Sequence, residues 1–355
     1  MITNKTTLLI LISIFSFPLY ANNKIISFDN DSVNSVFCTK TNCFFPSEYI
    51  SNKDIHVTNT INWNRGKNLI LHTKGNIVFK QNGKIITAGD ESIILKAGML
   101  PGNKKPYNSI VKFEGSTPQI EMHGTGIVEI YYNPEKGREK HKYHNPILYG
   151  DVLPNLRLQT YMLVNNIYDL QGITACLHCS YSLSQNIDAS PTRKWNYSQD
   201  RYHGFYPIMG FLNKAAFSGT FEGNNYVIDG LYIDRPDESN AGLFGDVTGV
   251  NTYKSTIKNL MLINSDVTGK RCVGAVVGQA TGIRLGNIIV PEDKNRVRSI
   301  LDEEQKEHDI LGLLAGCILS NTHVNLSTKG SSISADEKPL FGSCYNCNEE
   351  TVEDE

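Results

Sequence analysis

The sequence carries almost no net charge. Its 34 Lys and Arg residues nearly balance its 36 Asp and Glu residues, and the formal charge at pH 7 is −2. A protein that binds nucleic acid through the phosphates needs an excess of basic residues, so nucleic acid is excluded as a general partner. Glycine and proline, at 29 and 13 residues, are too few for a collagen-like or low-complexity chain. With 40% hydrophobic residues, the chain has enough apolar side chains for a sizeable core.

The sequence also lacks an uninterrupted apolar run of about 18 residues, so no transmembrane anchor is expected. One shorter apolar stretch, residues 8–17, follows Lys5 and precedes Ala21. A basic residue, a short apolar stretch and a small residue in this order are typical of a secretory signal peptide. We therefore predict a signal peptide over residues 1–21. The mature protein is expected to be secreted, or displayed on the outer-membrane surface, after passing through the periplasm.

Export affects how the eight cysteines are interpreted. In an oxidising compartment, cysteines that lie close together in the sequence favour disulfides. Two Cys-x-x-Cys sequences also permit a zinc site, and free thiols are a third possibility. A thioredoxin-like redox role is disfavoured because no βαβ pattern surrounds either sequence. Disulfides are the preferred interpretation, with no metal and no cofactor; the candidate cysteines are Cys38 with Cys43, Cys176 with Cys179, Cys344 with Cys347, and the remaining Cys272 with Cys317.

An eight-residue period runs through residues 67–98. Short apolar runs separated by turn-forming residues begin at Leu69, Ile77, Ile85 and Ile93. Such runs are typical of short β-strands, and a fixed period indicates a repeated unit. A β-meander is one interpretation, but strands of three residues make poor hairpins and most of these turns lack a hairpin signature. Three steps give a coil of about 24 residues, which favours a parallel β-helix whose coils bury one another's inner faces.

Beyond residue 180 the repeated element becomes an apolar run framed by glycines. Such blocks occur at residues 241–245, 273–278 and 311–316. We expect the glycines to let the backbone turn corners and to let neighbouring coils approach closely. A phosphate-binding loop is disfavoured because no Gly-Lys-Ser/Thr sequence follows the blocks. The candidate structural glycines are Gly242, Gly245, Gly274, Gly278, Gly312 and Gly316.

The changes in pattern along the chain predict its organisation. Residues 156–172 are expected to open a short helix, and the charged residues 291–309 are expected to form a solvated helical excursion. The predicted segments are the signal peptide (1–21), an N-terminal cap segment (22–60), coils with the eight-residue repeat (61–132), a loop or connecting segment (133–180), coils with glycine blocks (181–330) and a C-terminal tail (331–355).

The glycine blocks resemble a known motif. Residues 242–245 (Gly-Leu-Phe-Gly) and 273–278 (Val-Gly-Ala-Val-Val-Gly) resemble the GLUG motif of large bacterial surface proteins, as do residues 256–260 between them. Residues 181–190, 204–210 and 217–228 are similar to the sequence that precedes that motif. The chain thus resembles filamentous-haemagglutinin-type exoproteins. The resemblance implies an all-β fold, a right-handed parallel β-helix, and export by two-partner secretion with an outer-membrane partner. It supplies no catalytic residues.

These observations favour a non-enzymatic adhesin that binds a glycan or protein of a host or neighbouring cell surface. A β-helix presents long flat faces, and exposed aromatic side chains stack on sugars or pack in protein interfaces. The aromatic residues near position 200 are the candidate binding site, although they also fit a covering loop packed on the coils. The candidate binding residues are Trp195, Tyr197, Tyr202 and Phe205.

Two other functions fit the same sequence. A polysaccharide lyase or hydrolase on a β-helix would need paired carboxylates, or Ca²⁺ held by acidic groups beside a base. Acidic residues do surround Arg235, but their order is typical of a polar turn, so we expect no enzymatic activity. The other alternative is a periplasmic structural or secretion-accessory protein.

Overall fold

The computed structural model describes residues 38–39, 42–43, 47–99, 108–134, 146–210, 215–249, 255–300, 312–319, 322–325 and 341–345. For residues 38–39, 42–43, 323–325 and 341–345 only the backbone is described. The predicted signal peptide, Cys347 and residues 301–309 of the charged excursion lie outside the described residues. No helix within the described ranges combines the length and the apolar character that crossing a membrane requires.

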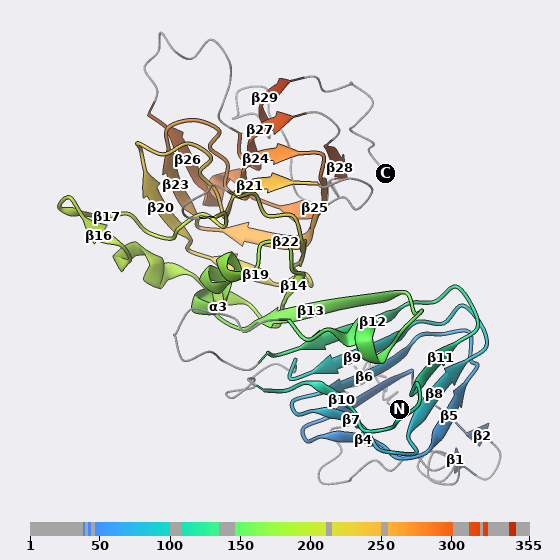
Figure 1. Ribbon diagram of the computed structural model, residues 1–355. Coiled ribbons are helices and arrows are strands. Elements are labelled where there is room, and N and C mark those ends of the chain that lie inside the picture. The colour runs from blue at the N-terminus through green and yellow to red at the C-terminus, as the bar shows by residue number, and fades with distance from the viewer. Residues whose placement is uncertain are drawn as a thin grey trace, which may run out of the picture.

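The N-terminal half is a stack of coils, and each coil adds one strand to each of three sheets (Figure 1). Every strand pairs in parallel with its equivalent in the next coil. One sheet contains β4 (Ile55–Val57), β7 (Ile77–Phe79) and β10 (Val111–Phe113); the second contains β5 (Thr60–Trp63), β8 (Lys84–Thr87) and β11 (Ile120–Met122); the third contains β3 (Glu48–Ser51), β6 (Leu69–Thr73), β9 (Ile93–Ala97) and β12 (Val128–Tyr132).

The eight-residue period matches the strands of this half. Leu69, Ile77, Ile85 and Ile93 lie at or near the starts of four successive strands, and all are buried. Leu69 pairs with Ile93, so one coil takes 24 residues here, as predicted. The pairing is parallel, which excludes the β-meander. The next coil is longer, since Ile93 pairs with Val128.

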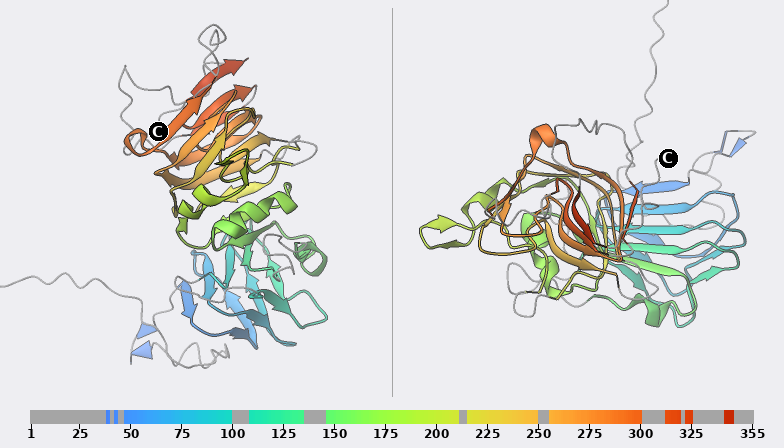
Figure 2. Two further views of the ribbon diagram at one scale, coloured as in Figure 1. Left: turned by 90° about the vertical axis from the view of Figure 1, so that its left-hand side faces the viewer. Right: turned by 90° about the horizontal axis from the view of Figure 1, so that it is seen from above.

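The longest sheet joins the two halves, and the C-terminal strands, coloured yellow to red, lie above the N-terminal ones in the left view of Figure 2. The longest sheet extends through β13 (Leu158–Val164), β14 (Tyr181–Leu183), β18 (Thr220–Glu222), β22 (Thr256–Ile263), β19 (Val227–Asp229) and β15 (Ile187–Asp188). In the same sheet β25 (Arg284–Ile289) pairs with β22, and β28 (His323–Asn325) pairs with β25. Two further parallel sheets contain β20 (Tyr232–Arg235), β23 (Asp266–Gly269) and β26 (Arg296–Ser299), and β21 (Phe244–Thr248), β24 (Val277–Thr281), β27 (Ala315–Leu319) and β29 (Phe341–Tyr345). The described chain is therefore an all-β protein built mainly from long parallel sheets.

Short excursions interrupt the coils. The described helices are α2 (Tyr149–Val152) and α3 (Ile167–Gly172), with 3₁₀ turns η1 (Ile173–Ala175), η2 (Ser190–Lys194) and η3 (Glu292–Lys294). Two antiparallel pairs lie outside the coils: β1 (Cys38–Thr39) with β2 (Asn42–Cys43), and β16 (Tyr197–Ser198) with β17 (Arg201–Tyr202). These helices, turns and antiparallel pairs are inserted between the strands of the coils.

Some segment predictions require correction. Coil strands already begin at Glu48, within the predicted cap segment, because β3 to β5 pair with the strands of the next coil. Residues 158–164 form a strand, and the short helix begins only at Ile167. Residues 296–299 form strand β26 instead of a helix, because the buried Val297 alternates with outward polar side chains and β23 supplies the backbone partners.

Inside the coils, aromatic side chains from successive strands pack against one another. Phe244 is fully buried, and its ring centroid lies 5.0 Å from that of Phe217 and 5.3 Å from that of Phe221. Phe217 and Phe221 lie in one stretch of chain and Phe244 in another, and Phe217 pairs with Val247 of the next coil, so the contact holds neighbouring coils together. Apolar burial of this kind is the main favourable contribution to folding.

Asparagines stack at one corner of the C-terminal coils. Asn225, Asn259 and Asn287 occupy equivalent positions in successive coils, with φ angles of 60°, 55° and 49°. Asparagine tolerates this left-handed conformation better than most residues. The Asn287 side-chain amide donates a 2.9 Å hydrogen bond to Asn259, and the Asn259 amide donates one of 2.9 Å to Glu222. The ladder aligns the turns of adjacent coils, and sequence analysis did not identify it.

The glycine blocks lie at close contacts between coils. A Cβ atom on Gly316 would lie 2.2 Å from the carbonyl carbon of Cys272, and one on Gly278 would lie 2.4 Å from the carbonyl carbon of Asn240. Both neighbours are backbone atoms, so a side chain could enter only if the coils moved apart. A Cβ would also be crowded at Gly242, Gly245 and Gly274, and the amide of Gly312 donates a hydrogen bond to Val273 of the preceding coil.

Asp246 supplies a prediction about pH. Its side chain is partly buried, and among the described residues its Oδ1 has no hydrogen-bond partner. Loss of solvation raises the pKa of this carboxyl above its usual value of 3.8. The folded protein therefore binds this proton more tightly than the unfolded protein does. The resulting stability is fully present below pH 3.8, and it is lost as the pH rises through the pKa of Asp246 in the folded protein. We expect Asp246→Asn to raise the unfolding midpoint in urea at pH 7.

The same variant should have little effect at pH 3, because the wild-type carboxyl is then protonated and resembles the amide. Parallel urea titrations at the two pH values measure the difference. An equal gain at both would show that packing, and not ionisation, distinguishes the two side chains.

Candidate functional site

The most prominent surface feature is the β16–β17 hairpin, which projects from the body of the molecule (Figure 1). Tyr197 and Tyr202 face each other across the hairpin. Gln199 and Asp200 form the turn with φ angles of 50° and 58°, and two successive positive angles suit a tight two-residue hairpin turn. The sequence lacks the usual Asn-Gly signature at this position, which explains why the hairpin was not predicted.

The tyrosines of the hairpin are unusually exposed. The relative exposure is 61% for Tyr197 and 42% for Tyr202. Their ring centroids lie 4.9 Å apart with an interplanar angle of 57°. Large aromatic side chains normally bury most of their surface on folding. A pair held together in solvent therefore presents an apolar surface that another molecule can cover.

A second aromatic stack forms the base of the hairpin. The Trp195 ring stacks on that of the exposed Tyr168, at 5.1 Å between centroids, and on that of Phe205, at 6.4 Å. Trp195 is half-buried, whereas Phe205 has 0% exposure. Phe205 was predicted as a binding residue, and this prediction requires correction. Its ring is enclosed by the body and cannot reach a ligand at the surface, so it serves to anchor the hairpin.

Polar contacts fix the chain that leaves the hairpin. The buried Arg235 donates a 3.2 Å hydrogen bond to the Phe205 carbonyl and a 2.7 Å one to Glu238, and its guanidinium lies 4.5 Å from the Tyr206 ring centroid. Gly204 has a φ angle of 75°, and a Cβ there would lie 2.2 Å from the Tyr232 carbonyl oxygen. A side chain at this position is therefore excluded by both conformation and space.

Three of the acidic residues near Arg235 have basic or amide partners. Asp237 is exposed and lies 3.3 Å from Arg201 of the hairpin, while Glu238 pairs with Arg235. Asp229 accepts a 2.7 Å hydrogen bond from Asn264. Each of these carboxylates is thus directed to its own basic or amide partner, and two of them brace the hairpin or the segment that follows it.

The described cysteines form two disulfides. Cys176 bonds to Cys179, and Cys272 bonds to Cys317 across adjacent coils, with Cα atoms 5.5 Å and 4.9 Å apart respectively. The backbones of Cys38 and Cys43 pair directly in the β1–β2 ladder, and Cys344 lies in β29, but their side chains are not among those described. Cys176 and Cys179 together with His178 also place three possible metal-ligand atoms within 4.8 Å of one another.

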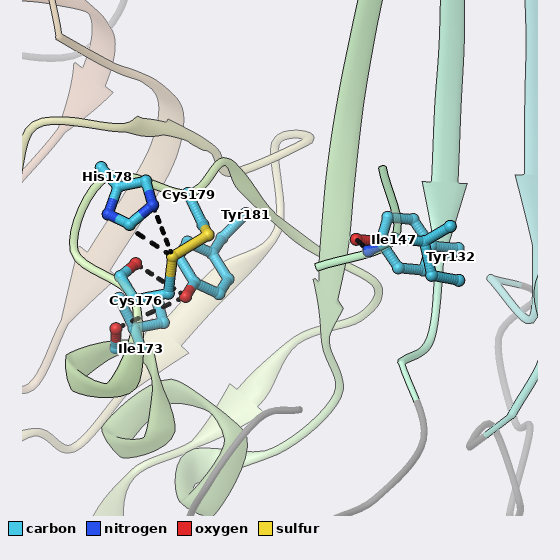
Figure 3. Close-up of a disulfide and its surroundings, with 7 residues drawn as sticks. All are labelled: Tyr132, Ile147, Ile173, Cys176, His178, Cys179 and Tyr181. Carbon is cyan, nitrogen blue, oxygen red and sulfur yellow. Dashed lines mark hydrogen bonds between the residues drawn. A yellow bond between two sulfur atoms is a disulfide. The ribbon is translucent and has the colours of Figure 1, made fainter. Parts of the chain in front are cut away.

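A cavity of about 330 Å³ lies beside the Cys176–Cys179 disulfide. Figure 3 shows the disulfide with His178, and Tyr132 and Ile147 nearby. The Ile147 amide donates a 3.0 Å hydrogen bond to the Tyr132 hydroxyl. Burial raises the pKa of Tyr132 to about 12, so its phenol stays protonated at neutral pH. No local sequence pattern indicates this cavity, since its lining comes from segments far apart in the chain: residues 132, 146–150, 158–160, 162 and 178–180.

Comparison with known proteins yields one partial similarity. A stretch of 124 residues is 40% identical to part of halomucin from Haloquadratum walsbyi. It covers 34% of this chain and 1% of the length of halomucin. No family model matches the chain, and no solved structure matches it. The resemblance to filamentous-haemagglutinin-type exoproteins therefore rests on the sequence motifs alone.

Proposed function

We propose that this protein is an exported, non-enzymatic adhesin that binds a cell-surface glycan through the β16–β17 hairpin. We also propose that its coils form a right-handed parallel β-helix of the filamentous-haemagglutinin type. Stacked parallel strands support this fold, and connections between parallel strands are right-handed in about 98% of cases. In this proposal the coils form the scaffold, and the hairpin is an irregular segment that projects from them.

The single observation that carries the proposed binding function is the exposed Tyr197–Tyr202 pair. The ring faces offer apolar area for the C–H face of a sugar. The Arg201–Asp237 pair at the next position of the same hairpin supplies hydrogen-bond donors and acceptors for hydroxyl groups. An apolar platform flanked by polar groups is the arrangement that a binding site for a polar, ring-shaped ligand requires.

The export part of the proposal rests on three observations. Residues 1–21 have the pattern of a signal peptide. The two described disulfides suit an oxidising compartment. The similarity to halomucin also fits an extracellular or cell-surface setting. An outer-membrane secretion partner would complete the route to the surface, and a tagged chain should then be labelled on intact cells. Labelling only after permeabilisation would favour a periplasmic protein instead.

Binding is tested with a glycan array and with whole-cell binding. We expect the double variant Tyr197→Ala/Tyr202→Ala to weaken binding at least tenfold, since aromatic hot spots contribute about 2 kcal/mol or more each. The matched control is Ile300→Ala, which removes another exposed hydrophobic side chain that is not part of the hairpin. This control should bind like the wild type.

Three results would contradict the proposal. Unchanged binding in the double variant would exclude the hairpin as the site. Binding to cell-surface proteins but to no glycan would reassign the ligand class. New reducing ends or unsaturated products from incubated polysaccharides would indicate an enzyme.

A further inference from the structure

The sequence Cys176-Leu177-His178-Cys179 is not part of the proposed binding hairpin, and it combines a disulfide with a histidine side chain. The chain enters it from the 3₁₀ turn η1 and leaves it for strand β14. The disulfide joins residues only three positions apart, so it links no coils. A loop this short limits the unfolded chain only slightly, and by the loop-entropy relation the bond contributes about 2 kcal/mol.

Hydrogen bonds hold the turn in addition to the disulfide. The Cys179 amide donates a 3.2 Å hydrogen bond to the Cys176 carbonyl, and the Tyr181 hydroxyl donates one of 2.9 Å to the same oxygen. The amides of Ser218 and Gly219, in a later coil, both donate to the Leu177 carbonyl, at 2.8 and 3.1 Å. These bonds would persist after reduction, so the two thiols would stay next to each other and re-form the disulfide readily.

The two cysteines differ in exposure and in surroundings. Cys176 is partly exposed, whereas Cys179 has a relative exposure of 8%. The exposed His178 places its Nε2 3.5 Å from the Cys176 Sγ (Figure 3). An imidazolium beside a thiol stabilises the thiolate, which is the reactive form. Because Cys176 is the more exposed of the two residues, an incoming thiol is expected to attack its sulfur with Cys179 as the leaving group, and His178 assists when Cys176 itself leaves in the second step.

The adjacent cavity provides a place for the partner of such a reaction. Cys179 and His178 form one side of it, and Leu148, Tyr149 and Met162 are among its apolar lining. Its volume of about 330 Å³ lies within the range of small-ligand sites. An apolar side chain next to a reacting cysteine would fit there, beside the disulfide.

We propose that Cys176–Cys179 is a thiol–disulfide exchange site that acts on the cysteine pair of another exported protein. A thiolate of the partner attacks the Cys176 sulfur, a mixed disulfide forms, and Cys179 leaves as a thiolate that takes a proton from water. The second partner thiolate attacks the partner's own sulfur in the mixed disulfide and releases Cys176 as a thiolate beside His178. The partner loses two electrons, and Cys176 and Cys179 gain them.

The first test exposes the folded full-length protein to reduced glutathione, then alkylates the thiols and identifies them by mass spectrometry. Glutathione supplies both thiols and becomes its disulfide. We expect Cys176 and Cys179 to be alkylated while Cys272 and Cys317 stay oxidised and the circular dichroism spectrum is unchanged. Reduction of all four cysteines together, and only on unfolding, would overturn the proposal.

The second test uses variants that leave one sulfur of the pair. Cys179→Ala should form a mixed disulfide with oxidised glutathione rapidly, and Cys176→Ala slowly, because Cys179 is buried. In the reduced wild type, His178→Gln should raise the pKa of the Cys176 thiol and lower its alkylation rate at pH 6 roughly tenfold for one unit of pKa. The matched control is the exposed His123→Gln, which should behave like the wild type. A pH profile unchanged by His178→Gln would contradict the proposal.

A metal site is the alternative that the same residues allow. If the reduced protein takes up one Zn²⁺ tightly, and Zn²⁺ then blocks both alkylation and reoxidation by oxidised glutathione, the residues serve metal binding and exchange is excluded. Reoxidation that proceeds in the presence of Zn²⁺ supports the exchange site. None of these results depends on whether the β16–β17 hairpin binds glycans.

Discussion

Replacing Phe244 by alanine is expected to lower the free energy of unfolding by about 3–5 kcal/mol. Its side chain has 0% exposure and packs on Phe217 and Phe221 between neighbouring coils. Removing the ring leaves a cavity that coils held by β-ladders cannot collapse to fill. Urea denaturation monitored by circular dichroism measures the loss, and hydrogen exchange should place it in the C-terminal coils.

Two variants serve as controls for this prediction. Phe244→Leu keeps most of the volume and should lose less than about 1.5 kcal/mol. Tyr202→Ala removes an equally large ring from the exposed hairpin and should change stability by no more than about 0.5 kcal/mol. A loss in Phe244→Ala as small as that in Tyr202→Ala would mean that the rings do not hold the coils together.

The second large effect is expected at the disulfide between coils. Cys272 and Cys317 are 45 positions apart, and closing a loop of that length stabilises the folded state by about 4 kcal/mol on the loop-entropy relation. The double variant Cys272→Ala/Cys317→Ala should lose about that amount. Alanine keeps a Cβ at Cys272, whose φ angle is 51°, so the backbone strain there is unchanged. Thermal and urea unfolding under non-reducing conditions measure the loss.

The comparison variant is Cys176→Ala/Cys179→Ala, which opens a much shorter loop and should lose about 2 kcal/mol. The order of the two losses is the informative result. If the short loop proved the more important, its disulfide would be structural, and the entropic reason for the large effect at Cys272–Cys317 would fail.

Several parts of the fold could be predicted from local sequence. Leu69, Ile77, Ile85 and Ile93 are buried at or near strand starts because each coil repeats the same inward position. The glycines that frame the later blocks lie at close backbone contacts, as at Gly316. Strand β26 was missed because its inward residue, Val297, stands alone among polar neighbours, so its pattern is too short to distinguish a strand from a helix.

The candidate sites were only partly predictable. Trp195, Tyr197, Tyr202 and Phe205 stand out in the sequence as aromatic residues, but their composition does not tell which are exposed. That depends on Arg235 and on the chain beside β20, which enclose Phe205 and leave the two tyrosines in solvent. The cavity beside Cys179 had no local signal at all, since its walls come from different coils.

The sequence by itself determined the short strands, their spacing in the N-terminal coils and the residues that face inward, because each follows from a repeat over neighbouring residues. Only the tertiary structure decided which aromatic rings are exposed, which carboxylates are paired, and which cysteine sulfur lies toward solvent beside a histidine. Those properties depend on contacts between residues that are tens of positions apart, and a one-dimensional pattern does not record them.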